Sequence, residues 1–213
     1  MPLLKTLNFG KRHTRFTTRM RITPKRVKNL SFLVVDNFFT DQELQEVVQE
    51  ARYLKTFLLG PEKTNTAKDE NNRLKKIGQG VFLDTFYEGK RENSKILKAN
   101  RILFSKKICS VAEELDSVFT FIRYSNVDYT ILNSYVEDGE YKAHHDTSRI
   151  SAVTFLREGD FTGGEFQFPQ QNVKIPAEQN RTVIFPSCAL HQALPLKGTG
   201  NRISIAQFIN YED

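Results

Sequence analysis

The sequence predicts an α+β fold: a jelly-roll barrel of eight strands, with helices packed on one outer sheet. Two observations predict it. The first half of the chain carries apolar residues at helical spacing, whereas from Tyr129 onward short apolar segments alternate with turn residues. At 213 residues, the chain is long enough for one domain with a substantial core.

The first elements can be placed from capping and periodicity. Phe32–Asp36 is a short apolar run that is typical of a buried strand. Thr40 and Glu43 fit a capping box, and the apolar residues that follow recur on one helical face. We therefore expect a helix at about 41–54.

The next segment contains few apolar residues. A polar stretch of this length, 60–79, indicates either a lid over a pocket or an ordinary mobile excursion, and the sequence leaves both open. Val81–Phe86 is expected to return as a strand. Apolar residues from Ser94 to Val118 follow a 3.6-residue period, which predicts one long amphipathic helix with an interruption at Asn100–Arg101.

The second half contains short strands separated by turns such as Glu137–Gly139 and Pro169–Asn172. We expect strands near 129–136, 141–146, 150–156, 164–168, 173–175, 181–185, 190–194 and 202–209. Eight strands in this order predict the jelly-roll core at about 129–209, within a domain that spans 30–213.

The positive charge is concentrated at the N-terminus. Residues 1–28 hold nine lysines and arginines and no acid, although the whole chain has a net charge of +6. We therefore separate residues 1–29 as a basic arm. Such an arm could touch nucleic acid or an acidic partner, but a solvated terminal segment is the favoured interpretation.

The sequence lacks membrane-spanning and secretory segments and has only two cysteines, which bears on its compartment and redox state. No apolar run approaches membrane-spanning length, and the N-terminus lacks the apolar core of a secretory signal, so we expect a cytoplasmic protein without membrane contact. Cys109 and Cys188 lie far apart in unrelated contexts, which favours two reduced, buried thiols over a disulfide.

Three adjacent side chains suggest a metal site. In a strand, His144 and Asp146 point to one face and His145 to the other. An imidazole beside a carboxylate, with one more ligand from elsewhere, is how proteins hold ferrous iron by one face. His145 is then a bystander near the mouth of the site.

The third ligand is sought among the four histidines. His13 lies in the basic arm, whereas His191 falls where one predicted strand ends and the next begins. In an eight-stranded jelly roll the second and seventh strands lie close together, so His144, Asp146 and His191 should converge. A His-x-Asp pair with a later histidine, all in the expected strands, is less readily a coincidence than a lone core histidine.

A buried cation is expected in the last strand. Alternation places Arg202, Ser204 and Ala206 on one face and two isoleucines on the other. The isoleucines should pack against the helices, so Arg202 should face into the barrel, where a guanidinium needs an anion. The carboxylate of a ligand would meet that need, and so would a protein acid at the barrel mouth.

With these motifs in place, residues 135–208 resemble the Fe(II)/2-oxoglutarate-dependent oxygenases, particularly their prolyl 4-hydroxylase-like branch. The matching positions are Tyr135, His144-x-Asp146, Gly163-Gly-Glu165, Phe185-Pro-Ser187, His191 and Gly200-x-Arg202-x-Ser204. The opening strand and helix resemble that branch as well, which extends the resemblance to about 30–210. Arg202 stands where many members have lysine, and Phe155–Glu158 departs from the usual Tyr-Leu-Asn.

The resemblance implies a double-stranded β-helix, Fe(II) bound by His144, Asp146 and His191, and 2-oxoglutarate bound by Arg202, with Tyr135 and Ser204 nearby. It implies hydroxylation of a prolyl or other residue in a peptide or protein, with O₂ consumed, succinate and CO₂ released, and ascorbate as an optional cofactor. The polar segment 60–79 would close over the substrate.

Two alternatives stay open at this stage. The same core could oxidise a small molecule or a nucleic acid held by the basic arm, or it could be a non-catalytic jelly roll that keeps its metal for stability. The combination of a metal triad with Arg202 argues against the second alternative, because a structural metal site does not need an anion anchor.

Overall fold

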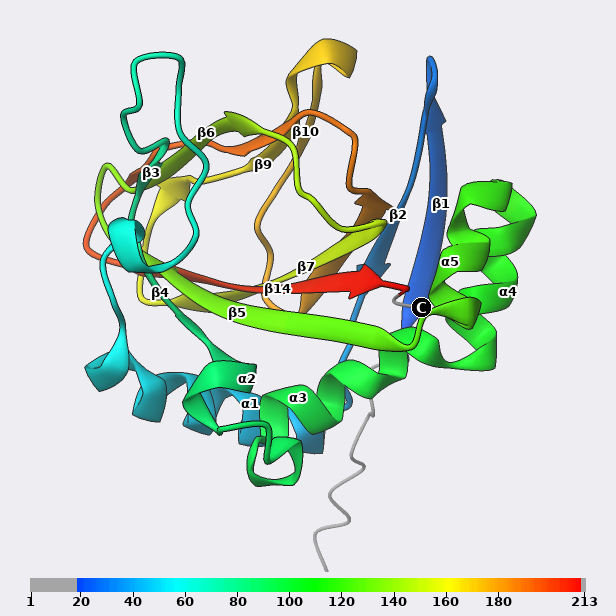
Figure 1. Cartoon of the computed structure of the whole chain (residues 1–213), viewed down its shortest axis with the longest axis horizontal. Helices are drawn as coiled ribbons and strands as arrows, with labels where there is room; N and C mark the ends of the chain where they lie inside the picture. Colours follow the sequence, from blue (N-terminus) through cyan, green and yellow to red (C-terminus); the bar gives the residue numbers. More distant parts are fainter. Residues whose placement is uncertain (1–18, 212–213) are drawn as a thin grey trace, which may run out of the picture.

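The structure is a computed structural model in which residues 19–211 are described (Figure 1). Its larger sheet has seven antiparallel strands in the order β1-β2-β11-β7-β14-β5-β4. The bounds of these strands are β1 Arg21–Val27, β2 Leu30–Asp36, β11 Arg181–Pro186, β7 Ile150–Glu158, β14 Asn201–Asn210, β5 Val127–Tyr135 and β4 Gln79–Phe82. The long central strands β7, β14 and β5 are the floor on which the site is built.

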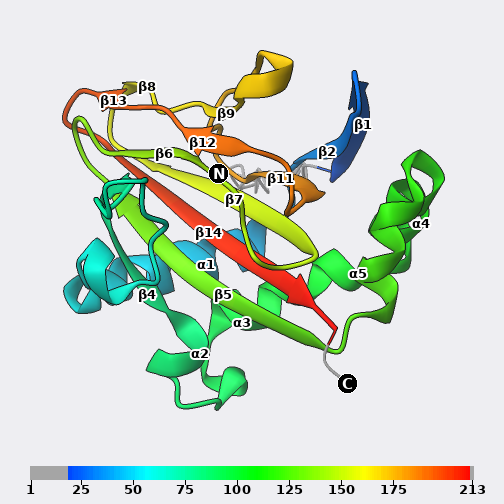
Figure 2. The same cartoon turned by 45° about the horizontal axis from the view of Figure 1, so that its top comes forward.

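A smaller sheet lies over this floor, as the turned view shows (Figure 2). It has five strands in the order β10-β9-β12-β6-β3. They are β10 Val173–Ile175, β9 Phe166–Phe168, β12 His191–Ala193, β6 Glu140–His144 and β3 Lys76–Ile77, and a separate pair joins β8 Thr162–Gly163 to β13 Leu196–Lys197. The two facing sheets form a double-stranded β-helix, so the predicted α+β jelly roll is confirmed.

Helices cover the outer face of the larger sheet (Figure 1). The first, α1 Asp41–Leu54, begins at the predicted capping box, in which Thr40 Oγ1 accepts from the Glu43 amide at 3.3 Å and Glu43 Oε2 accepts from the Thr40 amide at 2.9 Å. The remaining helices are α2 Leu83–Phe86, α3 Lys95–Ala99, α4 Lys106–Leu115 and α5 Thr120–Tyr124.

The prediction of one long helix over 94–118 was wrong. Ser94 caps α3 and Ser105 caps α4, and each serine hydroxyl accepts from a backbone amide three residues on. Extended backbone at Ser105 starts a new helix there, because a serine at an N-cap satisfies amides that an unbroken helix would bond internally. A 3₁₀ turn, Asn100–Phe104, fills the gap at the suspected interruption.

Two further expectations are corrected. The strand expected over 81–86 ends at Phe82, and α2 follows because the Asp84 carboxylate accepts the Thr130 amide at 3.0 Å and turns the chain under β5. Residues 21–27, assigned to the basic arm, form edge strand β1. A solvated arm stays a prediction only for residues before 19, which lie outside the described residues, as does His13.

Burial separates the two faces of the floor. Ile203 and Ile205 on β14 pack with the helices in the larger apolar cluster, as alternation predicted. Ala206, on the opposite face of the same strand, belongs to a second cluster inside the barrel with the phenylalanines of β9 and β11. The inner face therefore lines the space between the sheets.

Both cysteines are free, as expected. Cys109 is buried in α4, and burial raises the pKa of its thiol. Cys188, expected to be buried, is exposed because it lies in the turn after β11. Among the described residues, no helix is long and apolar enough to cross a membrane.

Candidate active site

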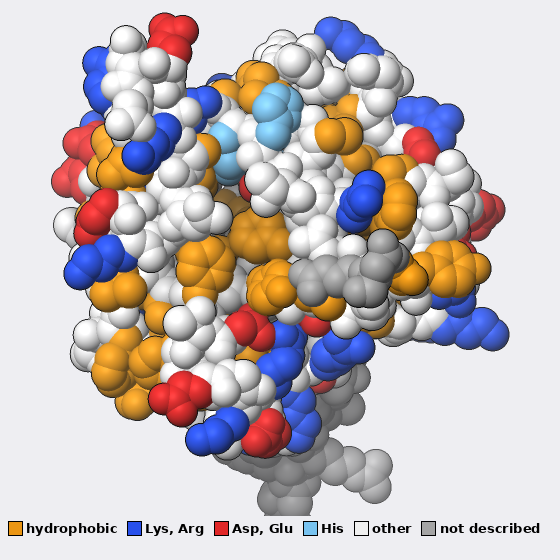
Figure 3. Space-filling view, in the orientation of Figure 1, with side chains coloured by type: hydrophobic (Ala, Val, Ile, Leu, Met, Phe, Trp, Pro, Cys, Tyr) orange, Lys and Arg blue, Asp and Glu red, His pale blue; other side chains and the backbone are white. Residues whose placement is uncertain are grey.

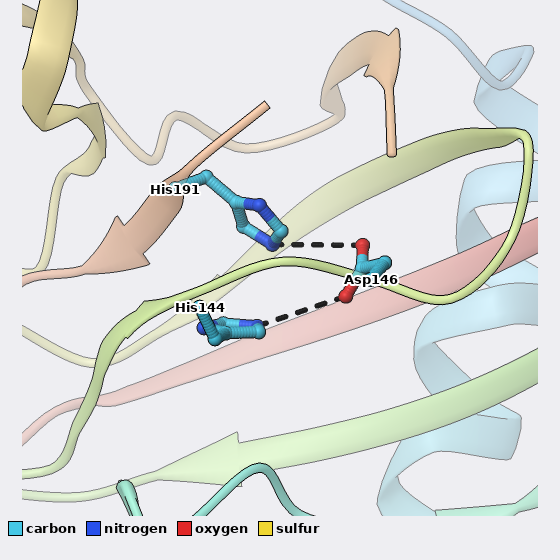
Figure 4. Close-up of side chains that lie close together, drawn as sticks. All are labelled: His144, Asp146 and His191. Atoms are coloured by element: carbon cyan, nitrogen blue, oxygen red, sulfur yellow. Dashed lines mark ion pairs between the residues drawn. The ribbon is translucent and has the colours of Figure 1, made fainter. Parts of the chain in front are cut away.

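The predicted triad converges between the two sheets (Figure 4). His144 is the last residue of β6 and His191 the first residue of β12, and these strands pair so that the two histidines face each other in register. Asp146 lies just past the end of β6, where its amide donates to the Ser187 carbonyl at 3.1 Å. The turn after β6 therefore carries the carboxylate back toward both imidazoles.

The donor atoms are spaced for one shared cation. Asp146 Oδ1 lies 3.7 Å from His144 Nε2, and Asp146 Oδ2 lies 3.5 Å from His191 Nε2. Ligand atoms that bind one metal at about 2.1 Å lie no more than about 4.2 Å apart, so both distances fit. Two imidazoles and one carboxylate on one side of the space form the facial donor set typical of non-haem Fe(II) oxygenases.

The imidazoles are oriented by carbonyl groups behind them. Nδ1 of His144 lies 2.8 Å from the Lys142 carbonyl, and Nδ1 of His191 lies 3.0 Å from the Ala189 carbonyl. Each Nδ1–H donates there, which leaves the Nε2 lone pair facing Asp146. Burial lowers the pKa of both histidines to about 4, so both rings are neutral ligands at neutral pH.

Asp146 is held by a group of three serines, of which Ser151 and Ser187 are buried. The Ser151 hydroxyl donates to Asp146 Oδ2 at 2.6 Å, and Ser151 is in turn 2.8 Å from the Ser187 hydroxyl, which contacts Ser148 at 2.6 Å. Burial raises the pKa of the Asp146 carboxyl, and the hydrogen bond from Ser151 opposes that rise. The serines fix the carboxylate before any cation binds.

Aromatic rings pack around the imidazoles. Tyr141 stacks on His144 with ring centroids 3.6 Å apart, and Phe185 meets the edge of His191 with centroids 4.7 Å apart. Phe166 stacks against the same imidazole. These rings restrict both histidines to one orientation and exclude water from the back of the triad.

Arg202 lies inside the barrel, as alternation predicted, with only 1% of its surface exposed. Its Nη1 donates to the Gly164 carbonyl at 2.6 Å and to the Leu194 carbonyl at 3.3 Å, whereas Nε and Nη2 have no partner. Among residues 19–211, no carboxylate oxygen lies within 4 Å of it. Burial lowers its pKa, yet a guanidinium stays charged in proteins.

Unpaired donors on a buried cation are costly. A carboxylate ligand would accept from Nε and Nη2 together, which is the geometry in which arginine binds carboxylates most strongly. The donor set at this end of the cavity therefore fits the carboxylate end of 2-oxoglutarate. The charge of Glu165 raises the pKa of Arg202, but no carboxylate of the described residues forms an ion pair with the guanidinium.

The Gly163–Gly164 step explains how a loop reaches the guanidinium. Both glycines have positive φ, at 71° and 69°. A Cβ on Gly163 would lie 2.7 Å from the Pro195 carbonyl oxygen, and one on Gly164 would lie 3.3 Å from Arg202 Nη1. Only glycine allows this approach without displacing these neighbours.

Tyr135 and Ser204 border the guanidinium. Tyr135 pairs with Arg202 across β5 and β14, and the guanidinium carbon lies 4.2 Å from its ring centroid. Burial raises the pKa of Tyr135 to about 12, with the Arg202 charge acting in the opposite direction, so its hydroxyl stays protonated and can donate. Ser204, one step along the same face, is buried as well.

The triad and Arg202 share one cavity of about 550 Å³, a size typical of small-molecule sites. In the space-filling view, the molecule is hollowed at this face, with hydrophobic side chains on the floor of the hollow and histidine at its rim (Figure 3). His145 lines the cavity but is exposed, and its Nδ1 lies 2.9 Å from the Cys188 carbonyl. It is not part of the cluster that could hold a metal.

Sequence reasoning missed several residues of the site. Ser151 and Tyr141 support the triad, while Asn133 and Lys76 line the cavity near Tyr135. Asn133 could have been found, because it lies two residues before Tyr135 and therefore on the same strand face. Lys76 carried no such signal, since it lies at the end of the polar segment.

The sequence model of the 2OG-Fe(II) oxygenase superfamily matches residues 130–210, which include the triad and Arg202. The match covers fewer than half of the 213 residues, and these are the residues that carry the candidate site. No curated protein sequence matches the chain. The family match and the triad support a 2-oxoglutarate-dependent dioxygenase that uses Fe(II), 2-oxoglutarate and O₂.

Solved structures share the fold of this chain. A viral collagen prolyl hydroxylase from Paramecium Bursaria Chlorella virus-1, in its 2OG complex, is 15% identical, with a TM-score of 0.54 over 85% of this chain and 96% of that chain. A Pseudomonas putida prolyl-4-hydroxylase is 16% identical, with a TM-score of 0.52 over 85% and 93%. A Trichoplax adhaerens prolyl hydroxylase, in complex with a peptide fragment of the hypoxia inducible factor oxygen degradation domain, is 14% identical, with a TM-score of 0.58 over 84% and 83%.

Proposed function

We propose that this protein hydroxylates a prolyl or other residue in a peptide or protein, with His144, Asp146 and His191 as the Fe(II) ligands and Arg202, Tyr135 and Ser204 as the 2-oxoglutarate site. One observation carries the proposal: a neutral-imidazole and carboxylate triad shares a cavity with a buried arginine whose Nε and Nη2 lack acceptors. A structural metal site would not need that arginine.

The chemistry comes from the bound groups: O₂ and 2-oxoglutarate are converted to succinate and CO₂ as one C–H bond of the substrate becomes C–OH. The protein positions the reactants. Asp146 and the two Nε2 atoms would hold Fe(II) together, and the rest of the cavity would be left for co-substrate and substrate. Arg202 binds a carboxylate through its free donors, and the protonated Tyr135 hydroxyl donates beside it.

A peptidyl substrate is supported by the rest of the cavity. Part of its wall is apolar, with Phe82, Ile131 and Phe208 on the inner face of the larger sheet. Such a wall accommodates a side chain with little polarity, such as a pyrrolidine ring. The structural neighbour from Trichoplax adhaerens is in complex with a peptide fragment, which adds support for a peptide over other substrates.

Residues 60–79 act as the closing segment in this proposal. Thr64 to Ala67 line the cavity, and the Ala67 amide donates to the Tyr141 hydroxyl at 2.9 Å. Tyr141 in turn stacks on His144, so the segment docks directly beside the triad. Within the segment, residues 64–67 are tied to the cavity by the Ala67–Tyr141 and Thr64–Lys76 hydrogen bonds, which opening of this part would break.

The test has two steps. First, the purified protein is assayed for Fe(II)-dependent conversion of 2-oxoglutarate to succinate in the absence of other substrate. Second, proline-containing peptides, free amino acids and oligonucleotides are screened by mass spectrometry for a gain of one oxygen atom. Hydroxylation of a peptide residue is expected. A protein that neither binds Fe(II) nor turns over 2-oxoglutarate would contradict the proposed enzyme, and oxidation confined to amino acids or oligonucleotides would contradict the peptide substrate.

A further inference from the structure

Lys76 is a second buried cation in the cavity. Only 3% of its surface is exposed, although it lies next to the polar segment that borders the mouth. Its Nζ donates to Thr64 Oγ1 at 2.8 Å and to Asn133 Oδ1 at 3.1 Å, and it lies 5.8 Å from the centre of the Tyr141 ring. Within residues 19–211, no carboxylate oxygen comes within 4 Å of this ammonium group.

A lysine in this position has an energetic cost. Burial lowers its pKa from 10.5 to about 8, so the ammonium form still predominates at neutral pH. Its two acceptors are neutral oxygens, which leaves the charge without a counterion. Buried lysines are rare unless they are paired, which makes an anion from outside the protein the natural partner.

The side chains of Lys76 and Arg202 both contact strand β5. Lys76 reaches Asn133, and Arg202 lies against Tyr135, two residues further along β5. Residues two apart on a strand share a face and lie about 7 Å from each other. Ser204 pairs with Asn133 just as Arg202 pairs with Tyr135, so both cations border one stretch of the cavity floor.

We propose that Lys76 is a second anchor for 2-oxoglutarate, and that it pairs with the carboxylate that Arg202 does not hold. This inference rests on the proposed function, in which the dicarboxylate occupies this cavity. Two carboxylates then meet two fixed cations, one from β14 and one from β3. The pairing of Lys76 with this carboxylate would also link the co-substrate to the closing segment, because Lys76 Nζ also donates a hydrogen bond to Thr64 Oγ1.

Binding of 2-oxoglutarate, measured by calorimetry on the whole chain with Mn(II) in place of Fe(II), tests the role of Lys76. Lys76→Met keeps the length of the side chain and removes the charge, and it should raise the Kd for 2-oxoglutarate about tenfold or more, because a charge-assisted hydrogen bond is lost. Lys76→Arg should restore most of the affinity. Lys68→Met removes the same charge from an exposed position on the same segment and should leave the Kd unchanged.

Several results would overturn the role. If Lys76→Met binds 2-oxoglutarate as tightly as the wild type, Lys76 serves only to hold Thr64 by a hydrogen bond. If the variant loses thermal stability together with affinity, and Lys76→Arg does not rescue binding, the effect is structural. A wild-type protein that does not bind 2-oxoglutarate would instead refute the proposed function, which distinguishes that failure from failure of this inference.

Discussion

The two ends of the cavity are built on opposite principles. At the triad end, Asp146 supplies a negative charge and serines and carbonyl groups hold every donor in place. At the other end, Arg202 and Lys76 are buried and form no ion pair with a carboxylate of the described residues, and two guanidinium nitrogens lack partners. The first end is ordered for a cation before the cation arrives, whereas the second end is completed only by a dianion. The contrast assigns metal and co-substrate to separate sets of residues.

The largest effect is expected from Asp146→Ala. The variant removes the only carboxylate of the triad, so Fe(II) binding and succinate formation should both fall to background. Calorimetry with Fe(II) under anaerobic conditions and a succinate assay measure the two losses. Asp138→Ala is the matched control, because Asp138 is an exposed carboxylate that pairs with Lys197 on the surface. Retained turnover in Asp146→Ala would break the assignment of this end to the metal.

The next effect is expected at the opposite end. Arg202→Met should raise the Kd for 2-oxoglutarate about a hundredfold, because it removes a two-bond contact to a carboxylate. Metal affinity should not change, since the guanidinium does not contact the triad ligands. Arg52→Met, which removes a largely exposed arginine from α1, provides the control for net charge. A parallel loss of metal and 2-oxoglutarate binding would contradict the division of the cavity.

The sequence predicted the parts of the site that are encoded locally. His144 and Asp146 are two residues apart, and strand alternation alone placed Arg202 inside the barrel. The long helix over 94–118 failed for a local reason as well, since the Ser105 cap outweighed an unbroken apolar stripe. What could not be predicted depends on pairing between distant segments.

Ser151 illustrates this limit. It bonds Asp146 from only five residues further along the chain, but Ser187 joins the same hydrogen-bonded group only because β11 pairs with β7. Lys76 enters the cavity because the short strand β3 pairs with β6 at Tyr141, and nothing in the polar segment signals that pairing. Both residues lie on strands whose neighbours come from far along the chain, so their roles follow from the fold.

A smaller effect is expected from the support of the triad. Ser151→Ala removes the hydrogen bond to Asp146 Oδ2 and should weaken metal binding by about ten- to a hundredfold, the usual range for groups that orient a ligand. Affinity for 2-oxoglutarate should be unchanged once the metal is saturating. Ser151→Thr keeps the hydroxyl and should recover most of the metal affinity. Unaltered metal binding in Ser151→Ala would mean that the serines serve packing alone.

The smallest effect is expected in the free energy of unfolding, which the buried charge of Lys76 lowers. The folded protein holds the pKa of Lys76 at about 8, against 10.5 for the unperturbed side chain. Below pH 8 both states carry the proton, and the burial penalty is complete. Between pH 8 and 10.5 the unfolded chain binds a proton that the folded protein has released, so the free energy of unfolding should rise with pH in this window.

Lys76→Met should abolish that rise. At pH 7 the variant should be more stable than the wild type by about 1–2 kcal/mol, allowing for the partial solvation of the ammonium group. Chemical denaturation of the metal-free protein at a series of pH values measures the difference, and Lys68→Met should follow the wild-type curve. A residue retained only for structure would give the opposite sign, with loss of stability in Lys76→Met. Higher stability combined with weaker 2-oxoglutarate binding would instead mean that the charge is kept at a cost to the fold because the co-substrate needs it.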